Sequence, residues 1–303
     1  SLCSMGLLYS DVTYESGVLS EFVGGQSPGT SYENWVSHVT EGIASEGFND
    51  YGPDWLDVQT NGFGSYRKLE EGSPTLVYWE TIFTQFIEGD TTTVDSLLQD
   101  SIESFFYELV IFEDTTVNKT FHILREQLDT SFVDLNQPDN DADDVIGSFR
   151  NSWGLYIINP AALREQIMIQ VPHPCDDFIA PYIALDIYQQ TDGFGFMING
   201  VGREVEWSEG GEYSNSKSHS DPSRYAPTVF QTFQEVVTQP LIGLNPHWPL
   251  VFAIHSFDNA SHAPRKSVII AAGAQNSFTT KPIRDITDDH FDIINFTEEF
   301  PIS

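Results

Sequence analysis

Residues 166–174 read QIMIQVPHP, and this short stretch indicates the fold. Its apolar character is nearly continuous up to Val171, as in a strand that is buried on both faces of a sheet. The run stops at Pro172, and His173 and the acidic pair Asp176-Asp177 follow closely. A strand that ends in this way places polar side chains at the edge of a sheet, where a metal ion or a substrate can bind. An ordinary acidic turn is the alternative.

Segments with strand-like and helix-like patterns alternate around this stretch. Apolar runs predict strands within 153–160, 166–174, 193–200, 248–257 and 266–273. Helices are predicted within 177–190, where Ile179, Ile183 and Ile187 would share a face, and within 226–237. This alternation predicts an α/β fold, with a mixed, largely parallel sheet flanked by helices.

The first part of the chain has a different character. Residues 1–134 contain turn-rich, aromatic-rich sequence, and we expect an irregular region that packs on the core. Helical spacing is also found within 91–110 and 120–128. The acidic stretch 135–144 predicts an exposed loop before an α/β core at 145–303. A single integrated domain is the alternative to this division.

The composition excludes some classes of partner. The chain has 303 residues, of which 40% are hydrophobic, so it can bury a full core. A net charge of −32 argues against binding nucleic acid, because phosphate recognition needs Lys and Arg side chains. The sequence also has no apolar run of the ~20 residues that a membrane span needs. We therefore expect neither nucleic acid nor a membrane span among its interactions.

The start of the chain bears on localisation. It begins SLCSMGLL without an initiator Met, and we expect a leader to have been removed and the protein to be secreted, periplasmic or on the cell surface. Cys3 and Cys175 are the only cysteines, and the sequence leaves open whether they pair.

Polar residues follow three of the predicted strands. His173 and Asp177 follow the first, Asn199 and Arg203 the second, and His255 the third. In open α/β sheets ligands bind beyond the carboxyl ends of the strands, so we expect these ends to converge. Two His and one carboxylate with a fourth position left open are the usual ligands of a catalytic zinc. Alternatively, each histidine only makes hydrogen bonds at a strand end, and the acids cap the next helix.

The motifs VPHPCDD, MINGVGRE, SHSDPSR, VFAIHSF and VIIAAG occur in this order between residues 150 and 275. In this order they resemble a set of secreted bacterial proteins related to the zinc carboxypeptidase-like group. This group includes N-formylglutamate amidohydrolase, poly-γ-glutamate hydrolase and aspartoacylase-type enzymes.

The resemblance implies one zinc ion per chain, held by His173, His255 and an acid of the first loop. Two patterns of the group place this acid differently: one at Asp177, which we prefer, and one at Asp176. For binding a substrate carboxylate, the candidates are Arg203, Asn199 and Arg224. Gly202 and Arg224 stand where relatives often have His, which bears on activity. For the general base, the candidates near the end of the chain include Glu298 and Glu299.

Two functions are therefore open. The first is a secreted zinc-dependent hydrolase that cleaves an amide or peptide bond in a small peptide or N-acyl amino acid with a free carboxylate. The second is an inactive relative that binds a glycan or a protein at a surface, and its contacts would come from the aromatic residues Trp35, Tyr51, Trp55 and Phe63.

Overall fold

The structure is a computed structural model, which describes residues 12–24, 66–100, 105–127, 150–174, 177, 180–202, 219–241, 249–255, 268–270 and 293–295. The chain divides into two compact units, residues 1–256 and residues 257–303. The predicted loop at 135–144 and the four aromatic residues Trp35, Tyr51, Trp55 and Phe63 lie outside the described residues.

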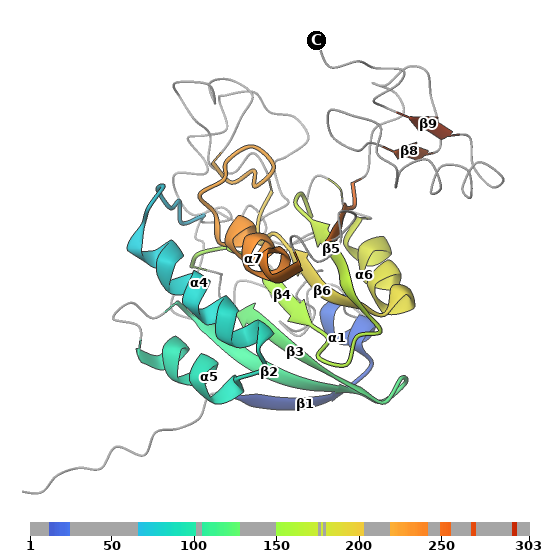
Figure 1. The fold of residues 1–303 in the computed structure, drawn as a ribbon, viewed down its shortest axis with the longest axis horizontal. Helices are drawn as coiled ribbons and strands as arrows, with labels where there is room; N and C mark the ends of the chain where they lie inside the picture. The colour runs from blue at the N-terminus through green and yellow to red at the C-terminus, as the bar shows by residue number, and fades with distance from the viewer. Residues whose placement is uncertain are drawn as a thin grey trace, which may run out of the picture. The chain divides into compact units, whose positions relative to one another are not determined.

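A seven-stranded mixed sheet forms the centre of the first unit (Figure 1). In spatial order its strands are β1 (Thr13–Gly17), β2 (Tyr107–Asp114), β3 (Lys119–Glu126), β4 (Leu155–Ile158), β6 (Gly193–Ile198), β5 (Arg164–Val171) and β7 (Leu250–Ala253). Strand β5 lies between β6 and β7 and is parallel to both, and β1 is parallel to β2. The other three pairings are antiparallel.

Helices cover both faces of this sheet (Figure 1). On one face, α4 (Pro74–Ile87) packs against α5 (Thr91–Asp100) and α7 (Val229–Thr238), which the short 3-10 helix η4 (Gln239–Leu241) follows. On the other face, α1 (Leu19–Gly24) packs against α6 (Ala180–Thr191), and α6 also contacts β5 and β6. This arrangement confirms the predicted α/β class with a mixed sheet. Strands β1 to β3, from the first part of the chain, extend the same sheet.

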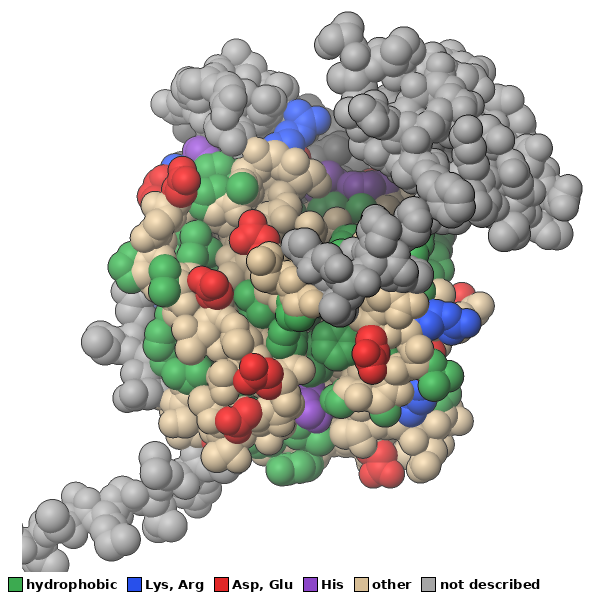
Figure 2. All heavy atoms as spheres, viewed as in Figure 1, with side chains coloured by type: hydrophobic (Ala, Val, Ile, Leu, Met, Phe, Trp, Pro, Cys, Tyr) green, Lys and Arg blue, Asp and Glu red, His purple; other side chains and the backbone are tan. Residues whose placement is uncertain are grey.

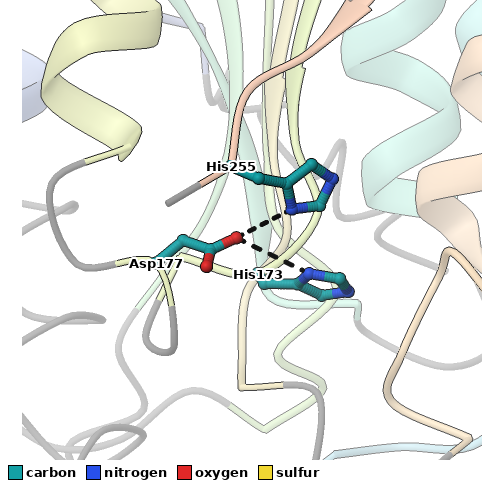
Figure 3. A group of neighbouring side chains, drawn as sticks. All are labelled: His173, Asp177 and His255. Atoms are coloured by element: carbon teal, nitrogen blue, oxygen red, sulfur yellow. Dashed lines mark hydrogen bonds and ion pairs between the residues drawn. The ribbon is translucent and has the colours of Figure 1, made fainter. Parts of the chain in front are cut away.

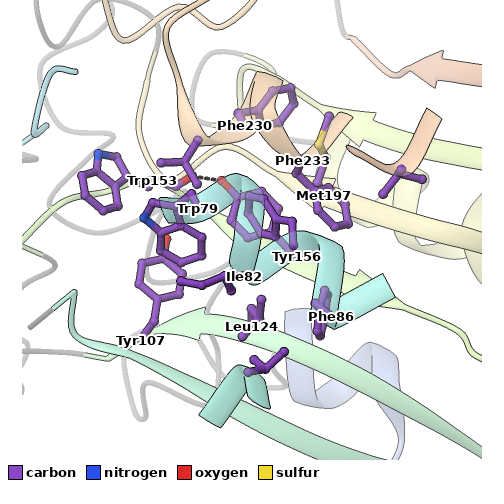
Figure 4. Close-up of a cluster of buried hydrophobic side chains, with 14 of the residues drawn as sticks. Trp79, Ile82, Phe86, Tyr107, Leu124, Trp153, Tyr156, Met197, Phe230 and Phe233 are labelled. Atoms are coloured by element: carbon purple, nitrogen blue, oxygen red, sulfur yellow. Dashed lines mark hydrogen bonds between the residues drawn. The ribbon is translucent and has the colours of Figure 1, made fainter. Parts of the chain in front are cut away.

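Each face of the sheet has its own apolar core, because successive side chains of a strand point to opposite faces. In β4, Leu155 and Ile157 belong to the cluster under α1 and α6, while Tyr156 and Ile158 belong to the cluster under α4 and α7. The second cluster is rich in aromatic rings (Figure 4). The ring of Tyr156 lies 4.9 Å from that of Phe83 and 5.0 Å from that of Phe233, measured between centroids.

One helix expected from the sequence is a strand in the structure, and a second is confirmed only in its first part, which is α5. Residues 120–128 were expected to form a short helix, but β3 pairs there with β2 in an antiparallel hairpin. The helix expected over 91–110 ends at Asp100, and its last part, from Tyr107, is β2. Both strands are buried on both faces over much of their length, so their apolar residues do not alternate with polar ones. Without alternation, spacing alone does not separate a strand from a helix.

The predicted helix face of α6 is also wrong in part. Ile183 was expected to face the core, but its side chain is 44% exposed, and Ala184, Leu185 and Tyr188 are buried instead. Ile179 lies outside the described residues. Residues two positions apart lie about 200° apart around an α-helix, so Ile183 and Leu185 are on nearly opposite faces, and burial of Leu185 leaves Ile183 exposed.

Two later strands differ from the expectation of fully buried strands in one sheet. Strand β7 is half-buried, because it is the edge strand of the seven-stranded sheet. In the second unit, β8 (Val268–Ile270) pairs in parallel with β9 (Ile293–Asn295) in a separate two-stranded sheet.

The visible face of the molecule carries scattered Asp and Glu side chains and few Lys or Arg side chains in its described part (Figure 2). This matches the excess of 45 acidic over 13 basic residues in the chain. None of the helices in the described ranges combines the length and apolarity that crossing a membrane requires.

Candidate metal centre

The carboxyl ends of three neighbouring parallel strands create the candidate site. Backbone hydrogen bonds continue past the strands: Asn199 N donates to the carbonyl oxygen of Val171 at 3.0 Å, and Ile254 N donates to that of Gln170 at 2.9 Å. His173 comes two residues after β5, and His255 comes two residues after β7. Since β5 and β7 are adjacent and parallel, the two histidines emerge at the same edge of the sheet. The predicted convergence of these strand ends is confirmed for this pair.

Asp177 joins the two histidines through the turn that follows His173. Asp177 N donates to the carbonyl oxygen of His173 at 2.9 Å, which closes a turn of the backbone. Its side-chain oxygen Oδ2 then lies 2.8 Å from His255 Nδ1 and 3.7 Å from His173 Nδ1 (Figure 3). The two imidazole rings are 4.9 Å apart between centroids. One ligand atom from each of the three residues therefore lies within 4.8 Å of the others, and the group can hold a metal ion.

Burial and charge suit a cation at this point. The side chains of His173 and Asp177 are 7% and 8% exposed, whereas that of His255 is 43% exposed, so the group is open to solvent on the His255 side. Burial by itself raises the pKa of Asp177. Hydrogen bonds and charge interactions with His173 and His255 outweigh this effect and hold the pKa well below its usual range. Asp177 is therefore an ionised carboxylate at neutral pH, as a metal ligand must be.

A second carboxylate contacts His173 on the opposite side of its ring. Asp221 Oδ1 lies 2.8 Å from His173 Nε2 and also accepts a hydrogen bond from Ser223 N at 2.9 Å. The other oxygen, Oδ2, lies 3.3 Å from Arg224 Nε. Burial raises the pKa of Asp221, but the bond and charge of His173 outweigh it, with smaller contributions from Ser223 and Arg224, and the pKa is lowered. This carboxylate thus links the histidine to an arginine.

The segment that carries Asp221 is tied to the end of β6. The buried side chain of Asn199 donates through Nδ2 to the carbonyl oxygens of Val201 and Ser220, at 3.0 and 3.1 Å. Ser220 Oγ donates in return to the carbonyl oxygen of Gly202 at 2.9 Å. Asn199 was predicted to bind substrate; in the structure its amide nitrogen holds the loop that carries Asp221.

Residues 151–154, directly before β4, pack against the backbone at Gly200, just after β6. A Cβ atom at Gly200 would lie 2.5 Å from backbone atoms of Ser152, so only glycine fits there. Glu126, buried at the end of β3, holds the same segment: it accepts hydrogen bonds from Asn151 N at 2.6 Å and Trp153 N at 3.3 Å. Burial raises the pKa of Glu126 to about 8, although these hydrogen bonds oppose the shift.

The structure places five of the predicted site residues, including Asn199 as described above, and not the others. The ligand atoms of His173, Asp177 and His255 lie close together. Arg224 contacts Asp221, which in turn contacts His173, and the side chain of Arg224 is 48% exposed. The remaining candidates lie outside the described residues: Asp176, Arg203, Glu298 and Glu299. Cys175, whose pairing with Cys3 was left open, lies outside them too.

Asp221 is the residue that the sequence reasoning missed. It lies in the SHSDPSR motif, which the resemblance includes, but nothing in the sequence assigned it a role. The available signal was an acidic residue followed closely by an arginine, in a segment just before a predicted helix.

Comparisons with known proteins do not identify a family. The chain matches no protein-family model, and no significant match was found among curated proteins or solved structures. The resemblance to the zinc carboxypeptidase-like group therefore stays a prediction.

Proposed function

We propose that the protein is a secreted zinc-dependent hydrolase that cleaves an amide or peptide bond in a small substrate with a free carboxylate. One observation supports this proposal above all others. Two imidazoles and one ionised carboxylate, from strand ends and a turn, meet at the edge of the sheet within 4.8 Å of one another.

The spacing of the ligand atoms suits zinc. Bonds of about 2.0–2.1 Å in a tetrahedral site separate neighbouring ligand atoms by roughly 3.4 Å. Asp177 Oδ2 lies 2.8 Å from the Nδ1 atom of His255 and 3.7 Å from that of His173, on either side of this spacing, and the three ligand atoms all lie within 4.8 Å of one another. Two nitrogen donors also favour zinc over Mg²⁺ or Ca²⁺, which prefer oxygen donors.

Three protein ligands are the number found in catalytic zinc sites, whereas structural sites have four. When bound, zinc would supply a Lewis acid that polarises a carbonyl group and lowers the pKa of water. The exposed side of the site, at His255, gives a substrate access to it.

Arg224 is the described residue best placed to bind a substrate carboxylate. Its guanidinium group is half-exposed and lies beside Asp221, which contacts the metal ligand His173. A guanidinium group can bind a carboxylate through two parallel hydrogen bonds, which fixes the orientation of the substrate. Arg203 remains a second candidate for this role, and Glu298 and Glu299 remain the candidates from the sequence for the general base.

Metal analysis tests the proposal. Protein purified without chelators, then given zinc and desalted, should contain about one zinc ion per chain. His173→Ala and His255→Ala should lose it, while His122→Ala, which removes a histidine of β3 away from the site, should keep it. Zinc retained by both site variants, or absent from the wild type, would overturn the proposal.

Activity is tested separately with N-acyl amino acids and γ-glutamyl peptides in the presence of zinc. Turnover that is lost in Asp177→Asn supports a hydrolase. Zinc binding without turnover of any of these substrates would instead favour a protein that keeps the fold and binds a partner without catalysis.

A further inference from the structure

We infer that Asp221 is the positioning residue of the metal centre: it fixes the ring of His173 so that Nδ1 faces the ion, and it holds Arg224 beside the site. This inference rests on the proposed zinc site. Asp221 itself touches neither the ion nor, by this account, the substrate.

The contacts on the two sides of the His173 ring support this role. Nε2 lies 2.8 Å from Asp221 Oδ1, while Nδ1 is the nitrogen that faces Asp177 and His255 (Figure 3). A carboxylate offers acceptors only, so its partner nitrogen carries the proton and the other nitrogen has a free electron pair for a metal. Histidine ligands are commonly oriented by a carboxylate in this way, which also makes the imidazole a stronger donor.

Asp221 is itself held firmly, as a positioning residue must be. Its side chain is buried, its Oδ1 accepts from Ser223 N, and its backbone carbonyl accepts from the amides of Arg224 and Tyr225 at 3.0 and 2.9 Å. Tyr225 in turn donates through its hydroxyl to the carbonyl oxygen of Leu69 at 2.8 Å. The carboxylate therefore has little freedom to turn away from His173.

The two oxygens of Asp221 serve different partners. Oδ1 contacts His173, and Oδ2 contacts Arg224 Nε at 3.3 Å. One carboxylate thus sets both the direction of a metal ligand and the place of the cation that would bind the substrate carboxylate.

The test compares zinc affinity among variants, measured by competition with a chromogenic chelator. Asp221→Asn keeps the shape of the side chain but removes its charge, and it should weaken zinc binding about 10- to 100-fold. Ser223→Ala is the matched control. It removes only a hydroxyl that lies 3.4 Å from His173 Nε2, farther away than Asp221, and it keeps the backbone hydrogen bond to Asp221. Its zinc affinity should stay within about twofold of the wild type. Arg224→Gln should bind zinc no more weakly than the wild type.

A spectroscopic measurement on the wild type does not depend on any variant folding. Long-range ¹H–¹⁵N correlation spectra of the zinc-loaded protein should show His173 bound through Nδ1 and protonated at Nε2. Binding through Nε2, or a zinc affinity of Asp221→Asn equal to that of the wild type, would overturn the role of Asp221 and leave the proposed function standing. Failure of the wild type to bind zinc at all would overturn both.

Discussion

Replacing Gly200 by alanine tests whether the loop between β6 and the candidate metal centre is held by close backbone contact. A Cβ atom at this position would lie 2.5 Å from the carbonyl carbon and oxygen of Ser152 and 2.6 Å from Gly154 N. Backbone atoms cannot rotate away as a flexible side chain can, so the two segments must separate. We expect the free energy of unfolding to fall by about 3 kcal/mol, at the upper end of the usual cost of overpacking.

The same substitution should weaken zinc binding. Asn199 and Gly202, on either side of Gly200, hold Ser220 by hydrogen bonds of 3.1 and 2.9 Å, and Ser220 precedes Asp221. Displacement of this loop therefore moves the carboxylate that contacts His173. Urea-induced unfolding gives the stability, and chelator competition gives the zinc affinity.

Gly72→Ala is the control for this experiment. Gly72 has φ of +71° and no atom within 4 Å of an added Cβ, so alanine there meets left-handed strain without a clash. It should cost about 1–2 kcal/mol and leave the zinc affinity unchanged. The reasoning is wrong if Gly200→Ala unfolds at the same urea concentration as the wild type and binds zinc equally well.

Two further predictions concern the helix α6 and the buried residue Glu126. Leu185→Ala should destabilise the protein by about 2–5 kcal/mol, whereas Ile183→Ala, which removes an exposed side chain from the same helix, should change stability by less than about 1 kcal/mol; equal losses in urea unfolding would refute the buried face of α6. Glu126 has an ordinary pKa of 4.5 and a folded pKa of about 8, so the folded protein binds more protons between these values and the contribution of Glu126 to stability falls as pH rises. The stability of the wild type minus that of Glu126→Gln should therefore decrease by a few kcal/mol from pH 5 to pH 8, and a constant or rising difference would contradict this.

Much of the fold and part of the site could be predicted from the sequence. The runs that became β4, β5 and β6 are short, apolar and bounded by turn residues, which is typical of strands buried on both faces. His173 and His255 could be found because each directly follows such a run, and adjacent parallel strands end at the same edge. The position of a residue just after a predicted strand is therefore the feature of the sequence that predicted the two histidines of the site.

Other features depend on contacts that a sequence pattern does not contain. Strand β3 is recognised by its pairing with β2, where Asn118 adopts a positive φ of 52° in the connecting turn. The contact between Asp221 and His173 joins residues 48 positions apart in the chain. Asn199 follows a strand just as the histidines do, but the direction of its side chain is set by Ser220, 21 residues later. Residue type and spacing do not distinguish a loop-holding amide from one that binds substrate.

X-ray absorption at the zinc edge of the loaded protein tests the metal centre most directly. The account predicts a first shell of nitrogen and oxygen only, at about 2.0–2.1 Å, with outer-shell scattering from two imidazole rings, both lost in the double variant His173→Ala/His255→Ala. A shell that contains sulfur at about 2.3 Å, or scattering from fewer than two imidazoles, would contradict it.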